Sequence, residues 1–158
     1  MSSAFEQARN VTHASFTIQR VFPQNPARVF RAFADPKAKA KWFHGPVEDW
    51  SPEVSEMDFR VGGQERSVGS FHGGEPHIFT AVYQDIVPDE RIVFSYDMQI
   101  GTRRISVSLT TIEFFPEGPG THMVFTEQGA FLDGWDDANG RERGTIELME
   151  QLARALMD

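Results

Sequence analysis

The chain has 158 residues, no cysteine and a formal net charge of -8 at pH 7. This length can bury a self-sufficient core, so we expect a single domain over residues 1–158 with its core at about 14–157. The missing cysteines exclude disulfides, thiolate metal sites and cysteine nucleophiles, and the acidic charge opposes binding to nucleic acid.

The beginning of the chain predicts one strand and two short helices. Alternating side chains predict a strand over Ala14–Phe22. Asn25 can cap a helix that has Pro26 in its first turn. A second short helix over Lys37–Trp42 is then followed by a Gly-Pro turn over Phe43–Pro46.

Six further strands are predicted in the middle of the chain, joined by short links that contain Gly or Pro. They are Met57–Val61, Glu65–Phe71, His77–Val87, Arg91–Gln99, Arg104–Phe115 and Thr121–Gln128. Links this short imply that neighbouring strands run antiparallel.

A Gly- and Asp-rich loop over Gly129–Gly140 leads to an amphipathic C-terminal helix. Its apolar stripe consists of Ile146, Met149, Leu152, Ala153 and Leu156. A strand, two short helices, a run of antiparallel strands and one long helix make an α+β arrangement. In it, the last helix covers the apolar face of the sheet.

Five segments between about Phe16 and Leu156 carry a family resemblance. They read FTIQRVFPQNPARVFRAFADP, KWFHGP, FRVGG, FTAVYQDIVPDERIVFSYDM and TIEFFPEGPGTHMVFTEQGAF. With the final helix, they resemble the C-terminal-like domain of the activator of heat-shock protein 90 ATPase, a branch of the START-related SRPBCC superfamily. Many relatives open the last helix with Gly-Trp, whereas this chain has Gly144-Thr145.

The resemblance implies a helix-grip fold, in which a curved antiparallel sheet wraps around the C-terminal helix and leaves an apolar ligand cavity between them. Alternation places the side chains of two neighbouring strands on shared faces: Ile92, Phe94, Tyr96 and Met98, then Ile105, Val107 and Leu109. Core packing explains each of these residues taken singly. The resemblance instead favours a cavity that the group lines together. The predicted ligand contacts are Trp42, Phe59, Phe79, Tyr83, Phe94, Tyr96, Met98, Phe125, Glu127, Trp135 and Met149.

Glu127 is the candidate polar residue of the site. It alternates with Met123 and Phe125, so it points to the same side of its strand as these apolar residues. Burial of a carboxylate raises its pKa, which suits either a ligand contact or a general acid or base. The alternative is that Glu127 leans into solvent or pairs with Arg103 or Arg104.

Two further sets of polar residues bear on the site. Tyr83 and Tyr96 carry hydroxyls that need a partner when buried, and a ligand or water could supply it. His72, Glu75 and His77 lie close together in the sequence, but no helical or hairpin register aligns them. We therefore expect no metal and no cofactor.

Three aromatic residues, Trp42, Phe43 and Trp135, lie beside turns or loops. Such residues either plug the end of the sheet or form the rim of an entrance to the cavity. The loop over residues 131–137 could then gate access.

These observations predict a small-molecule binding module that holds a hydrophobic or aromatic ligand. One alternative is a cyclase- or hydrolase-type enzyme that uses Glu127 on an aromatic or polyketide substrate. Another is a protein-interaction role, either as a chaperone cofactor or as a homodimer. The polar N-terminus Met1–Asn10 and the lack of a long apolar run predict a cytoplasmic protein without a membrane span.

Overall fold

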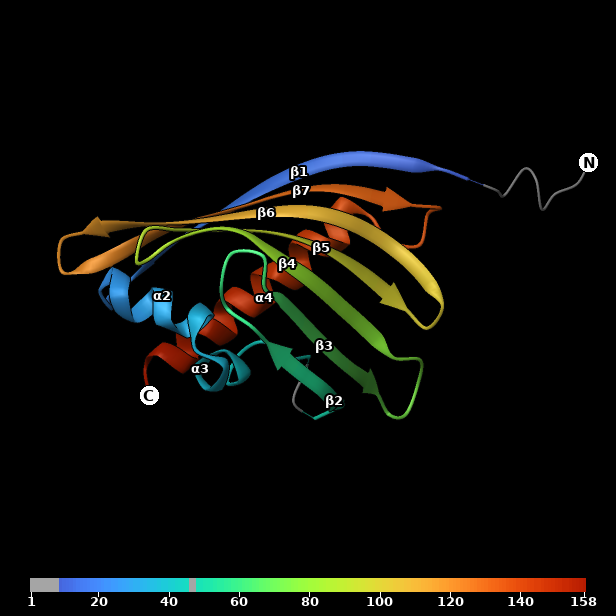
Figure 1. The fold of residues 1–158 in the computed structure, drawn as a ribbon, viewed down its shortest axis with the longest axis horizontal. Coiled ribbons are helices and arrows are strands. Elements are labelled where there is room, and N and C mark those ends of the chain that lie inside the picture. The colour runs from blue at the N-terminus through green and yellow to red at the C-terminus, as the bar shows by residue number, and fades with distance from the viewer. Residues whose placement is uncertain (1–8, 46–47) are drawn as a thin grey trace, which may run out of the picture.

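The structure, a computed structural model, describes residues 9–45 and 48–158. Most of the expected polar N-terminus, and Pro46 of the expected turn, therefore lie outside the described residues. Seven antiparallel strands form one curved sheet in the order β1-β7-β6-β5-β4-β3-β2 (Figure 1). The strands are β1 (Val11–Phe22), β2 (Trp50–Met57), β3 (Gln64–Phe71), β4 (His77–Val87), β5 (Arg91–Ile100), β6 (Arg103–Glu117) and β7 (Gly120–Leu132).

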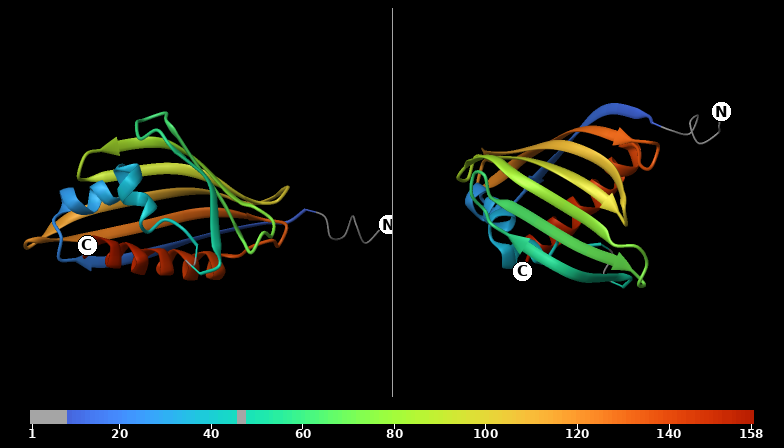
Figure 2. Two further views of the ribbon diagram at one scale, coloured as in Figure 1. Left: turned by 90° about the horizontal axis from the view of Figure 1, so that it is seen from below. Right: turned by 45° about the vertical axis from the view of Figure 1, so that its right-hand side comes forward.

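The helices are α2 (Pro26–Ala34), α3 (Pro36–Ala40) and α4 (Ala138–Leu156). Helix α4 runs across the concave face of the sheet, and α2 and α3 lie at the end of the sheet near the C-terminus (Figures 1 and 2). This arrangement confirms the predicted α+β helix-grip fold. No helix in the described part of the chain is long and apolar enough to cross a membrane.

Each helix begins at a side-chain cap. Asn25, Asp35 and Asp137 accept hydrogen bonds from backbone N–H groups of α2, α3 and α4 at 2.9, 3.0 and 2.7 Å. Such caps satisfy N–H groups that have no partner within the helix. Helix α3 is shorter than the predicted Lys37–Trp42, and α4 begins inside the predicted loop Gly129–Gly140.

The predicted strand Met57–Val61 was wrong. The edge strand β2 lies earlier, and the chain then turns through Gly62, whose φ is 86°. No strand was predicted around Pro52, because proline lacks the backbone N–H that a central strand needs. Proline is tolerated mainly at sheet edges and bulges. The β2–β3 register does shift between Pro52 and Val54.

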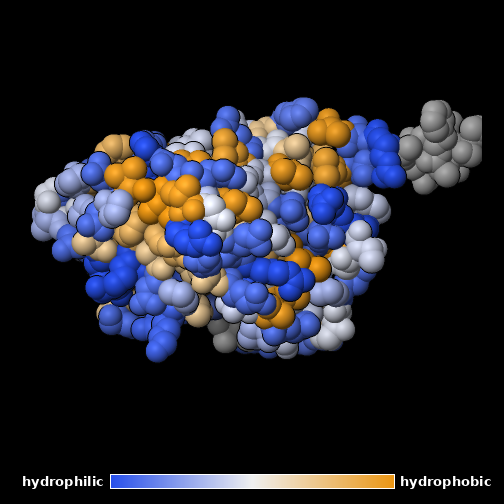
Figure 3. All heavy atoms as spheres, viewed as in Figure 1, coloured by the Kyte–Doolittle hydropathy of each residue, from blue (hydrophilic) through white to orange (hydrophobic). Residues whose placement is uncertain are grey.

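The predicted inward face of β6 was also wrong. Val107 and Leu109 are 45% and 39% exposed on the outer face, although Ile105 is buried as expected. The side chains buried on the inner face are instead Ser106, Ser108 and Thr110. The β5–β6 register shifts between Met98 and Gln99, just before this segment. In Figure 3, apolar side chains also reach the surface in groups between hydrophilic ones.

The core lies between the sheet and the helices. Ile92, Phe94 and Tyr96 of β5 are buried on the inner face, as their alternation predicts. Aromatic rings from α2 and the sheet meet edge to face, with Phe33 and Phe114 at 5.7 Å between centroids. Such pairs stabilise a core beyond the area that they bury.

Candidate functional site

A cavity of about 500 Å³ lies between the concave face of the sheet and α4. Its wall is mainly apolar and aromatic. The predicted ligand contacts that line it are Trp42, Phe79, Phe94, Tyr96, Met98, Phe125, Glu127, Trp135 and Met149. The fold therefore brings residues from three strands, two loops and α4 together around one cavity.

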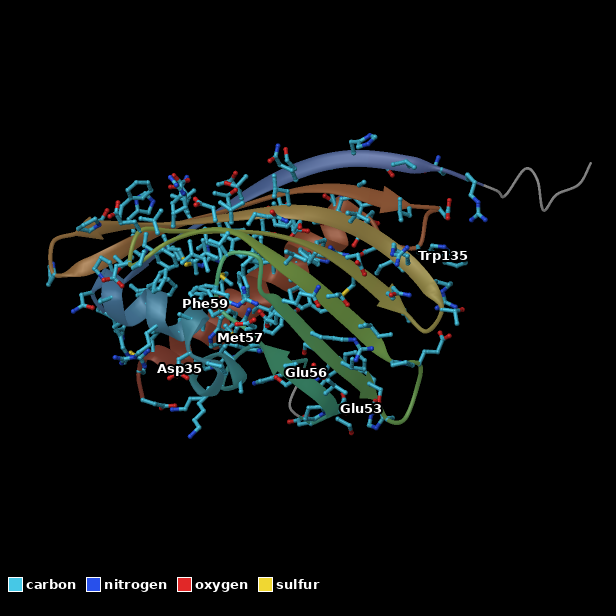
Figure 4. The ribbon with its side chains drawn as sticks, viewed as in Figure 1. Asp35, Glu53, Glu56, Met57, Phe59 and Trp135 are labelled. Carbon is cyan, nitrogen blue, oxygen red and sulfur yellow. The ribbon has the colours of Figure 1, made fainter. Side chains whose placement is uncertain are left out.

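Phe59 and Tyr83 do not belong to this lining. Phe59 packs against Phe30 and Tyr83, with ring centroids 5.8 and 4.9 Å apart. In Figure 4, Phe59 lies near α2, whereas Trp135 lies at the opposite end of the sheet. Phe59 and Tyr83 thus belong to the aromatic packing beside α2, not to the cavity wall.

Helix α4 contributes small residues to the cavity wall. Thr145 is buried, and its hydroxyl donates to the carbonyl of Arg141 at 2.8 Å. A methyl group on Gly144 would meet no heavy atom of another segment within 4 Å. The first turns of α4 therefore present little side-chain bulk to this part of the wall.

The first polar cluster of the cavity joins Tyr96, Glu127 and Arg141. The Tyr96 hydroxyl donates to Glu127 Oε2 at 2.8 Å. Arg141 Nη1 lies 2.8 Å from the Tyr96 oxygen and 3.2 Å from Glu127 Oε2. Glu127 is only 2% exposed, so the alternative of a solvent contact or a pair with Arg103 or Arg104 was wrong.

Electrostatics couple the members of this cluster. Burial, followed by the charge of Glu127, raises the pKa of Tyr96 above its ordinary value. Burial alone would lower the pKa of Arg141, but Tyr96, Glu127 and Asp136 outweigh it and raise the pKa. Arg141 Nη2 also donates to Ser106 at 2.7 Å and to Asp136 at 2.9 Å. The guanidinium therefore ties α4 to three strands of the sheet.

The second polar cluster joins Lys39, Glu65 and Tyr83. Lys39 Nζ lies 2.7 Å from Glu65 Oε1, and both side chains are buried. The Tyr83 hydroxyl donates to the same carboxylate oxygen, and burial followed by the charge of Glu65 raises the pKa of this tyrosine. Lys39 also lies 4.5 Å from the centre of the Phe43 ring and lines the cavity.

Both tyrosine hydroxyls thus have a carboxylate of the protein as partner, not a ligand or water as their burial suggested. Lys39, Arg141 and Thr110 also line the cavity wall, although none of them was predicted from the sequence. Their positions in the sequence do not indicate a shared site, because each of them meets its neighbours in the cavity only through the tertiary fold.

Two loops and the start of β6 meet at the rim beside Trp135. Arg103 lies 4.9 Å from the Trp135 ring and pairs with Glu75 at 2.8 Å. Trp135 is 52% exposed and lines the cavity. This contact fits the predicted rim, in which the loop before α4 borders the entrance.

The three residues weighed as metal ligands have separate surroundings. His72 pairs with Asp49 at 2.9 Å, and Glu75 pairs with Arg103. His77 packs against Trp50 at 5.7 Å between ring centroids. Within residues 9–45 and 48–158, no group of three or more His, Asp or Glu side chains is placed to hold a metal.

Comparison with known proteins gives one family and several similar structures. The family model "Activator of Hsp90 ATPase homolog 1-like protein" matches residues 23–157. A Rhizobium loti protein is 50% identical with a TM-score of 0.86, and the match covers 92% of this chain and 99% of that one.

Two further solved structures extend this set. A Rhizobium leguminosarum protein is 43% identical with a TM-score of 0.90, over 95% of this chain and 98% of that one. A Chromobacterium violaceum protein is 29% identical with a TM-score of 0.76, over 91% and 97%. No curated protein matches the chain.

Proposed function

The chain belongs to the family of activator of Hsp90 ATPase homolog 1-like proteins, and we propose that it binds a hydrophobic or aromatic small molecule in the cavity between the sheet and α4. The observation that carries this proposal is the cavity itself, with a volume of about 500 Å³. Small-molecule sites are typically concave, mostly apolar and about 300–1,000 Å³ in volume.

The wall of the cavity favours an apolar body with a few polar contacts. Phe79, Phe94 and Tyr96 pack against one another along one side, with Phe79 and Tyr96 at 4.9 Å between ring centroids. Burial of ligand surface against such side chains stabilises a complex by about 25 cal/mol per Å² of apolar area. Glu127 and Lys39 add polar groups that orient a ligand.

Native mass spectrometry of the purified protein, with a thermal-shift screen of apolar aromatic compounds, tests this proposal. We expect a co-purified small molecule or a rise in melting temperature with one compound class, because a ligand of the folded state stabilises it by mass action. An empty protein that no compound stabilises would contradict the proposal.

Two observations support other roles. Glu127 lines the cavity, so a cyclase- or hydrolase-type reaction on a bound aromatic or polyketide compound would use it as acid or base. Turnover assays on each compound that binds would reveal such a reaction. The family description concerns Hsp90 ATPase, and an ATPase assay of purified Hsp90 with this protein would reveal a chaperone partner.

A further inference from the structure

Strand β6 reverses the usual alternation of a half-buried strand. Between residues 106 and 110, its hydroxyl side chains face the inside, whereas Val107 and Leu109 face outward. Burial of hydroxyls in place of these apolar side chains costs free energy of folding. Proteins break such local rules mainly at functional sites, so the inner face of this segment is a candidate for ligand recognition.

Thr110 is the residue of this segment that faces the cavity. It is fully buried, it lines the cavity, and its Oγ1 has no hydrogen-bond partner among the described residues. Its neighbours in register are Phe94 on β5 and Glu127 on β7. Buried polar groups almost always form a hydrogen bond, so the hydroxyl of Thr110 is suited to bind a polar group of a ligand.

Glu127 offers an acceptor next to this hydroxyl. The hydrogen bonds that the structure shows for its carboxylate, from Tyr96 and Arg141, both fall on Oε2. Side chains directly opposite each other on paired strands have Cβ atoms about 5 Å apart. Thr110 and Glu127 are such a pair, so a small polar group of a ligand placed between them would contact both Thr110 Oγ1 and Glu127 Oε1.

The charges of the wall disfavour an anionic ligand. Its two permanent cations, Lys39 and Arg141, already pair with carboxylates, Lys39 with Glu65 at 2.7 Å and Arg141 with Glu127 at 3.2 Å. Burial lowers the pKa of His77, although Glu75 opposes this effect, so its surroundings disfavour the cationic form. A ligand carboxylate would therefore lose its hydration without gaining an unpaired cation.

Resting on the proposed function, we infer that the cavity selects an uncharged ligand that carries a hydroxyl group, with Thr110 and Glu127 as its specificity-determining residues. The ligand hydroxyl donates its hydrogen to Glu127 Oε1 and accepts one from Thr110 Oγ1. Its apolar body lies against Phe94 and Phe125, which line the same cavity.

A matched set of aromatic probes tests this inference. The probes are para-phenylphenol, its methyl ether and para-phenylbenzoate, which share one apolar body. Their affinities are measured by calorimetry on the wild-type protein and on T110V, which replaces the hydroxyl by a methyl group of similar size. The control T111V makes the same change at the next residue of β6, which alternation directs to the outer face.

We expect the phenol to bind wild type and T111V about tenfold more tightly than the ether, and the benzoate to bind more weakly than the phenol. In T110V, the phenol should lose this advantage while the ether keeps its affinity. Equal binding of phenol and ether to wild type, an unchanged preference in T110V, or tightest binding of the benzoate would overturn the inference and leave the proposed function intact. Failure of all three probes to bind would overturn the proposed function, and the inference with it.

Discussion

The hydroxyl of Tyr96 donates to Glu127 Oε2 at 2.8 Å across the inner face of the sheet, 31 residues away in the chain. Arg141 approaches both atoms from the first turn of α4. A carboxylate can be buried at low cost only when such donors surround it. This contact therefore links the packing of α4 on the sheet to the polar end of the cavity.

Loss of the Glu127 charge should destabilise the fold. We expect E127Q to lower the free energy of unfolding by about 3 kcal/mol, because it removes one partner of a buried ion pair. Urea unfolding measures this difference. The control E150Q, which makes the same change at an exposed residue of α4, should change stability by less than about 0.5 kcal/mol. Equal effects of the two variants would contradict the buried pair.

The two tyrosines should remain protonated at alkaline pH. Tyr83 and Tyr96 are the only tyrosines of the chain, and burial raises the pKa of both. The unfolded chain releases these protons near pH 10. Below that pH the contribution to stability is fully present, and it declines as pH rises above it because the unfolded state then binds fewer protons.

Ultraviolet absorbance of tyrosinate follows this titration directly, while circular dichroism shows whether the protein is still folded. The folded protein should show almost no tyrosinate at pH values where the same protein in urea is fully titrated. Titration of either tyrosine near pH 10 in the folded state would show that its hydroxyl is accessible.

Lys39 and Glu65 should be coupled energetically. K39M should lower the free energy of unfolding by about 3 kcal/mol, because it leaves the Glu65 carboxylate buried without its cation. The double variant K39M/E65L should recover part of this loss, because both charges are then removed. A double-mutant cycle in urea measures the coupling. Additive effects would mean that the 2.7 Å contact contributes nothing.

Removal of the Thr110 hydroxyl should stabilise the ligand-free protein. T110V deletes a buried hydroxyl that has no partner in the described part of the chain, so we expect the free energy of unfolding to rise by about 1 kcal/mol. T111V at the neighbouring residue should leave stability nearly unchanged. Thermal unfolding without ligand gives both values, and a clear loss of stability in T110V would mean that a protein group already holds the hydroxyl.

The sequence predicted the architecture well where alternation was unambiguous. In β5, Ile92, Phe94 and Tyr96 alternate with Val93, Ser95 and Asp97, and all three are buried. In β6, hydroxyls alternate with Val107 and Leu109, and the apolar set was assigned to the inside. Pairing with β7 determines which face of β6 points inward, because Thr110 lies opposite the buried Glu127.

The polar partners of the site were beyond sequence reasoning. Glu127 was identified as a candidate, but Arg141 was not, although it lies directly after the predicted loop Gly129–Gly140 and belongs to the first turn of α4. Lys39 meets Glu65 only because α3 packs beside β3. Contacts between distant segments depend on the tertiary fold, and strand or helix periodicity carries no information about them.

The most direct test of ligand binding is a fluorescence titration with N-phenyl-1-naphthylamine, an uncharged apolar dye. Trp42, Trp50 and Trp135 are the three tryptophans of the chain, and all line the cavity. A dye in the cavity should therefore quench their emission by energy transfer and brighten as it leaves water.

We expect saturable binding of one dye molecule to wild type and to T17F, which places phenylalanine at an exposed residue of β1. In T145F the new ring fills space beside α4, so affinity should fall at least tenfold while the protein stays folded. Saturable binding that T145F leaves unchanged, or no binding to wild type, would contradict a ligand cavity between the sheet and α4.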